Sequence, residues 1–297
     1  KHCCTEGHYQ ISIRKVFISK SAQFDYKVFF INRAFSLFIS PLLITQIAIA
    51  TLIYYALHRQ NIFYSGQFSD LSQSLVIALF SMAMFVVDDF TKYFVHRWMH
   101  NWSILWAFHK VHHSAETMTP ITVYRVHPAE GVLFGLRSAV SQGIVISIFI
   151  FLFGNAVDLY TIVGVNILVF FFHMTGSNLR HSHINIRYWK WLEYIFISPA
   201  QHQLHHSVAQ EHYDKNFGAA LAIWDWLFGS LHLSEEDKEI TYGLTGDPIA
   251  PKNIGDMYLR PFTDILNIVS QNFTKAQMRM FSSSTEKPFE ARFWPRH

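Results

Sequence analysis

One run of residues without any charge most constrains how this chain can fold. Residues 34–57 read AFSLFISPLLITQIAIATLIYYAL. As a helix this run would be about 36 Å long at 1.5 Å per residue, enough to cross a hydrocarbon core of ~30 Å. Only 15% of the whole chain is charged, against roughly 25% in ordinary soluble domains. We therefore predict a membrane-spanning helix over 34–57, with a kink at Pro41 that such helices tolerate.

Three further apolar runs follow along the chain. Leu75–Val87, extended through Asp88 and Asp89 to Val95, indicates either a second span with a polar inner end or a re-entrant helix. Residues 138–153 and 156–174 flank the turn signal Gly154-Asn155 and predict a helical hairpin. The alternative is a soluble core of buried helices, and the low charge across the whole hairpin argues against it. About four spans in an all-α chain are expected.

Positive charge predicts the orientation of these spans. The loop at 58–73 carries only Arg59 as a full positive charge. The basic residues shortly before the first run include Arg14, Lys15, Lys20, Lys27 and Arg33. The positive-inside rule then puts the N-terminus in the cytosol. The ends of the second and fourth spans return to that same side, so the histidine-rich segments after them would share one face of the membrane.

The remaining composition narrows the classes of protein. A net charge of +3 without a dense Lys/Arg run gives no indication of nucleic-acid binding. Cys3 and Cys4 are the only cysteines, so thiolate metal sites are excluded. We treat 1–297 as a single domain in which 236–297 forms a cytosolic extension, with an interfacial helix near 260–273.

Histidine is the anomalous residue type, and its spacing is more informative than its number. Thirteen of the 18 histidines lie between His96 and His212. Three clusters stand out: HRWMH at 96–100, HKVHH at 109–113 and HQLHH at 202–206. Because i, i+3 and i+4 lie on one face of a helix, each cluster aims its imidazoles in one direction. Eight imidazoles exceed what one tetrahedral metal can bind, so two metal ions are predicted.

A single histidine is more often a hydrogen-bonded core or surface residue than a metal ligand. We accept that interpretation for five of them: His2, His8, His58, His232 and His297. It fails for the three clusters, because burying that many rings without a metal would leave many nitrogens unsatisfied. Asp89, Tyr93, His96 and His100 share a helical face. Asp89 is therefore predicted either to orient a ligand ring or to face a polar cavity.

HRWMH, FHKVHH and QHQLHH resemble the three histidine boxes of the fatty acid hydroxylase superfamily, which includes sterol desaturases. YRVHPAE, NLRHSH and NFGAALAIWDWLFGS also look like that family, and the resemblance covers about 80–235. It implies four membrane helices under a cytosolic helical cap that holds two iron ions, with zinc as a possible substitute in a structure. The implied ligands are His96, His100, His109, His112, His113, His202, His205 and His206.

The family also uses a histidine between the second and third boxes. His181 is favoured here as this ligand, His173 is the second choice, and His183 is interpreted as an additional histidine that is not a ligand. His127 is expected at most to contact a ligand and not the metal. The resemblance implies O₂-dependent hydroxylation or desaturation of a membrane lipid. The chain lacks an HPGG-type haem motif, so electrons are expected from a separate donor protein. Two alternative functions remain. One is a zinc-dependent membrane hydrolase that uses Glu116, Glu130 or Glu211 as its acid or base, and the other is a non-catalytic metal-binding protein.

Overall fold

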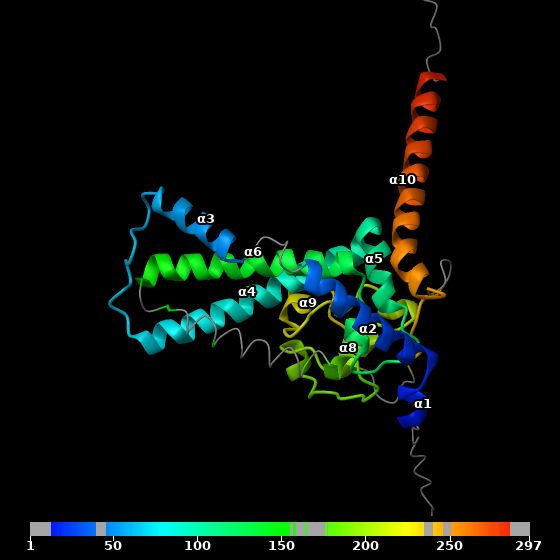
Figure 1. The fold of residues 1–297 in the computed structure, drawn as a ribbon, viewed down its shortest axis with the longest axis horizontal. Helices are drawn as coiled ribbons and strands as arrows, with labels where there is room; N and C mark the ends of the chain where they lie inside the picture. Colours follow the sequence, from blue (N-terminus) through cyan, green and yellow to red (C-terminus); the bar gives the residue numbers. More distant parts are fainter. Residues whose placement is uncertain are drawn as a thin grey trace, which may run out of the picture.

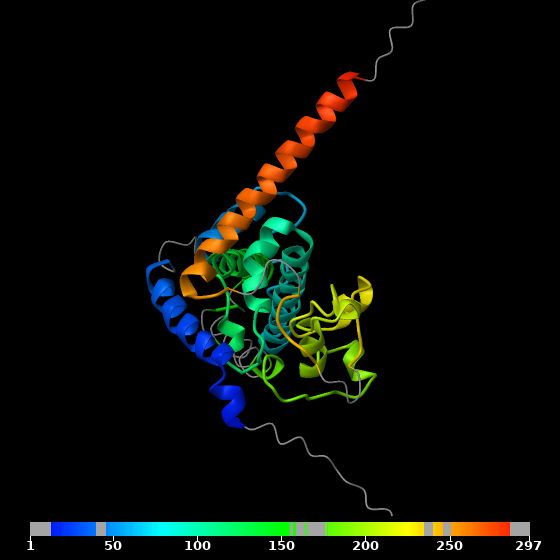
Figure 2. The ribbon, with the colours of Figure 1, turned by 90° about the vertical axis from the view of Figure 1, so that its right-hand side faces the viewer.

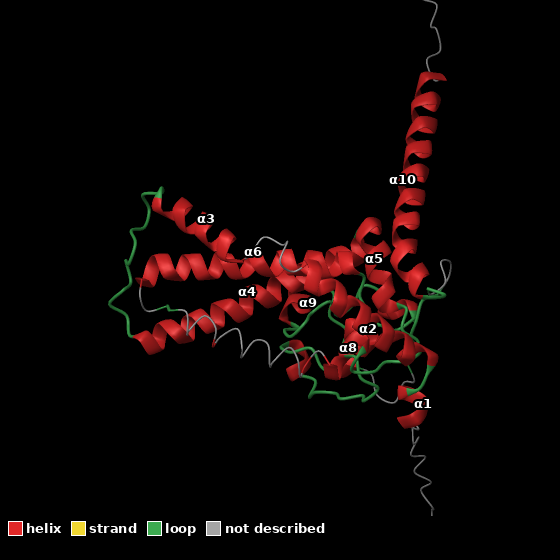
Figure 3. Ribbon diagram, in the orientation of Figure 1, coloured by secondary structure: helices red, strands yellow, loops and turns green. Residues whose placement is uncertain are grey.

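The computed structural model describes residues 13–39, 46–154, 157–158, 164, 176, 178–234, 240–245 and 251–285. These residues form α-helices, short 3₁₀ turns and loops, and the β-pairing among them is limited to two isolated bridges (Figure 3). The all-α class predicted from the sequence is therefore what the described residues show.

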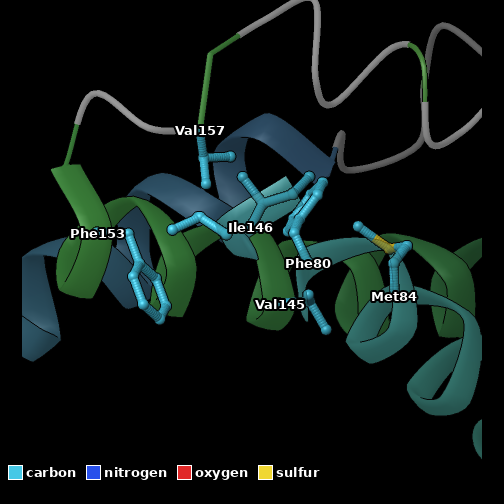
Figure 4. Close-up of a cluster of buried hydrophobic side chains, with 7 residues drawn as sticks. Phe80, Met84, Val145, Ile146, Phe153 and Val157 are labelled. Carbon is cyan, nitrogen blue, oxygen red and sulfur yellow. The ribbon is translucent and has the colours of Figure 1, made fainter. Parts of the chain in front are cut away.

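An elongated arm of three helices extends from a compact cap (Figure 1). The arm contains α3 (Gln46–His58), α4 (Gln73–Asn101) and α6 (Pro128–Phe153). Apolar side chains of α4 and α6, together with Val157, form its buried core (Figure 4): Val76, Phe80, Met84, Val145, Ile146, Phe153 and Val157. At Gly143 an added Cβ would lie 2.9 Å from Cγ2 of Ile49. The missing side chain thus allows α3 and α6 to approach closely, as small residues do between membrane helices.

Two of the described helices, α4 and α6, are long and apolar enough to cross a membrane. Their 29 and 26 residues correspond to about 44 and 39 Å at 1.5 Å per residue. The apolar run at 138–153 predicts only part of α6, which begins ten residues earlier. The true start at Pro128 is fixed by a cap, because Nδ1 of His127 accepts a hydrogen bond from the backbone N–H of Ala129 at 3.1 Å.

The structure does not describe either of the other two expected spans, 34–57 and 156–174, as one continuous helix. Residues 34–57 are divided between α2 (Lys20–Ile39) and α3, with 40–45 outside the described residues. Helices usually end at or before the residue preceding a proline, and α2 ends two residues before Pro41. The expected span at 156–174 lies almost entirely outside the described residues.

The cap end of α4 is polar, as the sequence predicted, and its charges are paired. Asp88 lies 2.8 Å from Nζ of Lys92, one turn further along α4, and accepts a hydrogen bond at 2.9 Å from Arg137 of α6. A carboxylate near the end of a span is tolerated when it is paired in this way. The Asp88–Arg137 pair also joins the two long helices where they enter the cap.

The cap is built from short helices and loops around that end of the arm. Its helices are α1 (Ile13–Phe17), α2 (Lys20–Ile39), α5 (Ser103–His113), α8 (Pro199–His205) and α9 (Ile223–Leu227). It also contains three 3₁₀ turns, η2 (Thr122–Tyr124), η4 (Leu192–Tyr194) and η5 (Gln210–His212). Buried Asp25 of α2 pairs with Arg125 and accepts a hydrogen bond from Thr122 at 2.7 Å. This network holds α2 against the loop after α5.

The C-terminal helix α10 (Ile254–Thr285) is longer than the expected 260–273 and contains Pro261. Its first turns pack on the cap, where Met257 forms a small buried cluster with Val28 and Val111. Beyond them the helix projects from the body, across the direction of α4 and α6 (Figures 1 and 2). Its position at a membrane interface remains a prediction.

Candidate metal centre

Each histidine box lies at the C-terminal end of a helix, either α4 where it enters the cap or one of two helices within the cap. His96 and His100 lie in the last turns of α4, and the second box ends α5. The third box lies on α8, a helix of seven residues that begins with a capping box between Ser198 and Gln201. Gln201 also donates a hydrogen bond to the carbonyl oxygen of Glu193 at 3.1 Å. These buried bonds fix the short helix, and with it the direction of its histidines.

The three boxes and His181 meet in two groups of ring nitrogens. In each group every residue offers one nitrogen, and these nitrogens all lie within 4.8 Å of one another. The five-histidine group is His96, His100, His109, His113 and His205. The four-histidine group is His112, His181, His202 and His206. Nine imidazoles from four stretches of chain therefore surround two adjacent points.

The hydrogen bonds behind the rings determine which nitrogen faces each point. Nδ1 of His96 lies 2.8 Å from the carbonyl oxygen of Phe217, and Nδ1 of His205 lies 2.7 Å from that of Lys215. A carbonyl oxygen only accepts, so each Nδ1 carries the ring proton and each Nε2 presents a lone pair. Nδ1 of His109 is held in the same way by Oε1 of Glu130 at 3.0 Å.

The inward-facing nitrogens are too close for neutral rings without a cation. Nε2 of His96 lies 3.0 Å from Nε2 of His205 and 3.1 Å from Nε2 of His109. Burial lowers the pKa of His205 to about 3, so a bridging proton is not retained there. Two ligands at 2.0–2.1 Å from a metal and at right angles to each other are about 3 Å apart. The separation is therefore compatible with nitrogens that bind one metal ion.

The four-histidine group repeats this pattern. Nε2 of His181 lies 3.0 Å from Nε2 of both His112 and His202. Burial, followed by the neighbouring rings, lowers the pKa values of His112, His202 and His206 well below the usual value. Both ring nitrogens of His206, and Nε2 of His100 and His113 in the other group, are buried without a hydrogen-bond partner. Such a donor set fits two metal ions of the kind that bind neutral imidazole, which are zinc, copper, iron and nickel.

A cavity of about 220 Å³ opens beside the two groups. Five of the nine histidines line it, together with the charged residues Lys92, Glu130 and Arg180. The apolar side chains of Val123, Val126 and Phe134 form another part of the wall. A ligand in this cavity would touch the metal-facing side of the site and an apolar wall at the same time. That combination suits an aliphatic group presented to a metal centre.

The sequence profile of the fatty acid hydroxylase family matches residues 81–230, which include all nine of these histidines. The chain belongs to the fatty acid hydroxylase family. The resemblance inferred from the three boxes is thereby confirmed, and the match ends close to the boundaries of 80–235 expected from the motifs.

Several curated relatives are enzymes of lipid oxidation by name. The chain is 29% identical to an ornithine lipid hydroxylase of Rhizobium tropici over 67% of its own length and 54% of that protein. It is 28% identical to human alkylglycerol monooxygenase over 54% of its length and 32% of that protein. It is 26% identical to a Delta(7)-sterol 5(6)-desaturase of Gibberella zeae over 50% of its length and 41% of that protein. The chain thus spans between about a third and about half of these relatives. No solved structure matches the chain significantly.

Of the three candidates for the histidine between the second and third boxes, the structure describes two. His181 lies in the four-histidine group. His183 lies outside both groups, with its ring against Phe17 at 5.5 Å between centroids. His173 lies outside the described residues. His58 is exposed and bonded to the carbonyl oxygen of Tyr54, which agrees with a surface role.

Asp89 and His127 were candidates for hydrogen bonding to the ligand rings, and both have other partners in the structure. Asp89 does not bond a ligand ring. Its carboxylate accepts from the backbone N–H groups of Ala220 and Leu221 and from Nε1 of Trp224, at 2.8–3.0 Å. His127 caps α6, and its Nε2 lies 3.2 Å from the carbonyl oxygen of Tyr258. A shared helical face indicates the direction of the Asp89 side chain, whereas the loop that packs against that face supplies its hydrogen-bond partners.

Sequence reasoning missed the residues that do hold the rings. Glu130 was considered only as an acid or base of a hydrolase, yet it bonds His109. The backbone of 215–217 holds His96 and His205, and no side-chain pattern could reveal a carbonyl oxygen. The position of Glu130 in the first turn of α6, close to a box in an apolar chain, was the available signal.

Proposed function

We propose that this protein is a multi-pass membrane oxidoreductase that binds two iron ions and uses O₂ to hydroxylate or desaturate a C–H bond of a lipid. The observation that carries the proposal is the convergence of nine buried or half-buried imidazoles into groups of five and four beside a cavity with an apolar wall. The family and its lipid-oxidising relatives support the reaction class. The proposed ligands are the nine histidines of the two groups.

When bound, the two iron ions would supply the reduction of O₂ and the oxidation of the C–H bond. The chain's own residues perform the remaining tasks. The carbonyl oxygens of Phe217 and Lys215 and the carboxylate of Glu130 keep the protons on the outer ring nitrogens, so that the inner nitrogens stay available. Val123, Val126 and Phe134 would position an aliphatic segment against the histidines.

The proposal includes the membrane arrangement. Four spans would place the histidine groups on the cytosolic side, where a separate electron-donor protein would reach them. The two long apolar helices, and the position of all nine histidines at one end of them, support this arrangement. Sterol, fatty acyl and related lipids are all compatible substrates.

Of the three carboxylates that the hydrolase alternative would use, only Glu130 lies beside the histidines, and one of its oxygens is engaged with a ring. Glu116 and Glu211 are exposed, and neither lines the cavity beside the histidines. Glu130 does line it, but its Oε1 is occupied by His109. No observation in the described residues therefore favours hydrolysis.

The test is reconstitution of the purified protein with ferrous iron under anaerobic conditions. We expect two iron ions per chain, oxygen uptake that depends on a reductant and a lipid extract, and a lipid product that has gained one oxygen or lost two hydrogens. Stoichiometric iron binding without oxygen uptake under all these conditions would exclude the proposed reaction. A metal content unaffected by loss of His205 would exclude the proposed ligands.

A further inference from the structure

A second cavity lies on the surface between α2 and the start of α6, and it is lined mainly by apolar side chains. This outer cavity has a volume of about 250 Å³ and is bounded by Phe29 and Phe35 of α2, Tyr124, and Val132 of α6. Phe35 and Tyr124 are 46% and 41% exposed, so its mouth is open. α2 lies at the cap end of the arm (Figure 1), the end at which two membrane-capable helices meet the cap.

The outer cavity and the cavity beside the histidines, here called the inner cavity, share one lining residue. Val126 borders both. Its backbone is fixed, because its carbonyl oxygen accepts a hydrogen bond from Nδ2 of Asn32 at 2.7 Å and Asn32 is itself held by the hydroxyl of Tyr258 at 2.8 Å. The side chain of a single valine is thus the feature common to an open apolar groove and the metal-facing cavity.

The size of the two cavities also indicates that they belong together. Sites for drug-sized ligands occupy about 300–1,000 Å³. The outer cavity, at about 250 Å³, and the inner one, at about 220 Å³, each fall short of that range. Taken together they fall within it. A flexible aliphatic chain is the type of ligand that could extend from one cavity to the other past a single side chain.

We propose that the outer cavity is the entrance for the aliphatic chain of a membrane lipid, and that this chain passes Val126 to reach the inner cavity. The proposal rests on the proposed function for the identity of the ligand as a lipid. It adds a route from the bilayer to the histidines and assigns the control of that route to one side chain. It also favours substrates with a long unbranched chain over those whose only apolar part is a fused ring system.

Photolabelling tests this route without measuring activity. The probe is a 16-carbon fatty acid with a diazirine near its terminal carbon, applied to the purified full-length protein and mapped by peptide mass spectrometry. We expect adducts on Tyr124 or Val132 in the outer cavity and on Val123 or Phe134 in the inner one. In Val126→Trp, inner labelling should fall by about tenfold or more, while outer labelling persists.

Val140→Trp is the matched control, because Val140 lies on α6 but is 46% exposed and lines neither cavity. It should label like the wild type. If Val126→Trp fails to fold, Val126→Phe gives a smaller block with the same expected direction. Equal inner labelling in wild type and in the folded Val126 variant, or no inner labelling in the wild type, would overturn the proposal. Labelling of both cavities in a protein that consumes no oxygen would leave the route intact and reject only the proposed reaction.

Discussion

At the scale of single residues, the decisive contacts are those behind the inward-facing nitrogens of the proposed metal centre. Glu130 and His109 are both buried, and Oε1 of Glu130 lies 3.0 Å from Nδ1 of His109. A carboxylate in this position fixes the tautomer and the orientation of a metal-binding ring. The second oxygen, Oε2, is buried without a hydrogen-bond partner, so the carboxylate is not held by a network of its own.

Replacing Glu130 should weaken metal binding without removing a ligand. We expect Glu130→Ala to lower metal affinity by about 10–100-fold, which is typical for the loss of such a partner. Glu130→Gln should retain part of the affinity, because the amide oxygen can still accept from Nδ1 of His109. Metal titration measures both effects. Glu116→Ala, at an exposed carboxylate, is the control and should bind like the wild type.

Removing a ligand itself should have a larger effect. In His205→Ala the five-histidine group loses a ring that lies 3.0 Å from Nε2 of His96. We expect the metal content to fall from about two ions per chain to about one, with loss of oxygen uptake, while the protein still inserts into membranes. His58→Ala, at an exposed residue outside both groups, should keep full metal content and activity. Full metal content in His205→Ala would show that the group assignment is wrong.

At the scale of elements, helical spacing explains much of the partition into two groups. Every i, i+4 pair of histidines enters a single group: 96 with 100, 109 with 113, and 202 with 206. The middle histidine of the second box, His112, joins the four-histidine group, although the other two residues of that box join the five-histidine group. The middle histidine of the third box, His205, does the reverse. The sequence could predict the pairs from the helical period. The placement of His112 and His205 in the other group depends on how α4, α5 and α8 pack together. Residue spacing within one helix does not encode that packing.

The loop that follows the third box is the element that ties the site together. Asp89 of α4 accepts from Ala220 and Leu221, and Asp225 of α9 accepts from the backbone N–H groups of Phe217 and Gly218 at 2.8 and 2.7 Å. Phe217 in turn holds His96 through its carbonyl oxygen. The motif NFGAALAIWDW was recognisable as a family feature, but its role as a support for a ligand ring required coordinates.

Gly218 should be intolerant of any side chain. A Cβ there would lie 2.6 Å from the carbonyl oxygen of Leu221 and 2.8 Å from Oδ2 of Asp225, so backbone must move. We expect Gly218→Ala to destabilise the protein by about 1–3 kcal/mol, as overpacking does, and to lower metal affinity through Phe217. Thermal unfolding and metal titration measure the two effects. Gly131→Ala is the control, since nothing lies within 4 Å of its added Cβ. An unchanged Gly218→Ala protein would show that this loop does not support the site.

At the scale of the whole molecule, the arm and the cap define an axis. All nine histidines lie where α4 enters the cap, and the loop at 59–72 lies at the far end of the arm (Figure 1). The positive charges near the N-terminus predict that the cap faces the cytosol. The number of spans could not be predicted as reliably as the site, because an apolar run such as 34–57 has the composition of a span whether it forms one helix or two.

Cysteine labelling in intact cells can test this orientation directly. Ser65 lies in the loop at the far end of the arm and Lys252 in the cap just before α10, and both are exposed. In a background in which Cys3 and Cys4 are replaced by serine, Ser65→Cys should react with a membrane-impermeant maleimide from outside. Lys252→Cys should react only after the membrane is permeabilised, because the cap would lie in the cytosol. The reverse pattern would place the histidine groups on the outer side, away from any cytosolic electron donor. Reaction of both residues from outside would mean that the arm does not cross the bilayer at all.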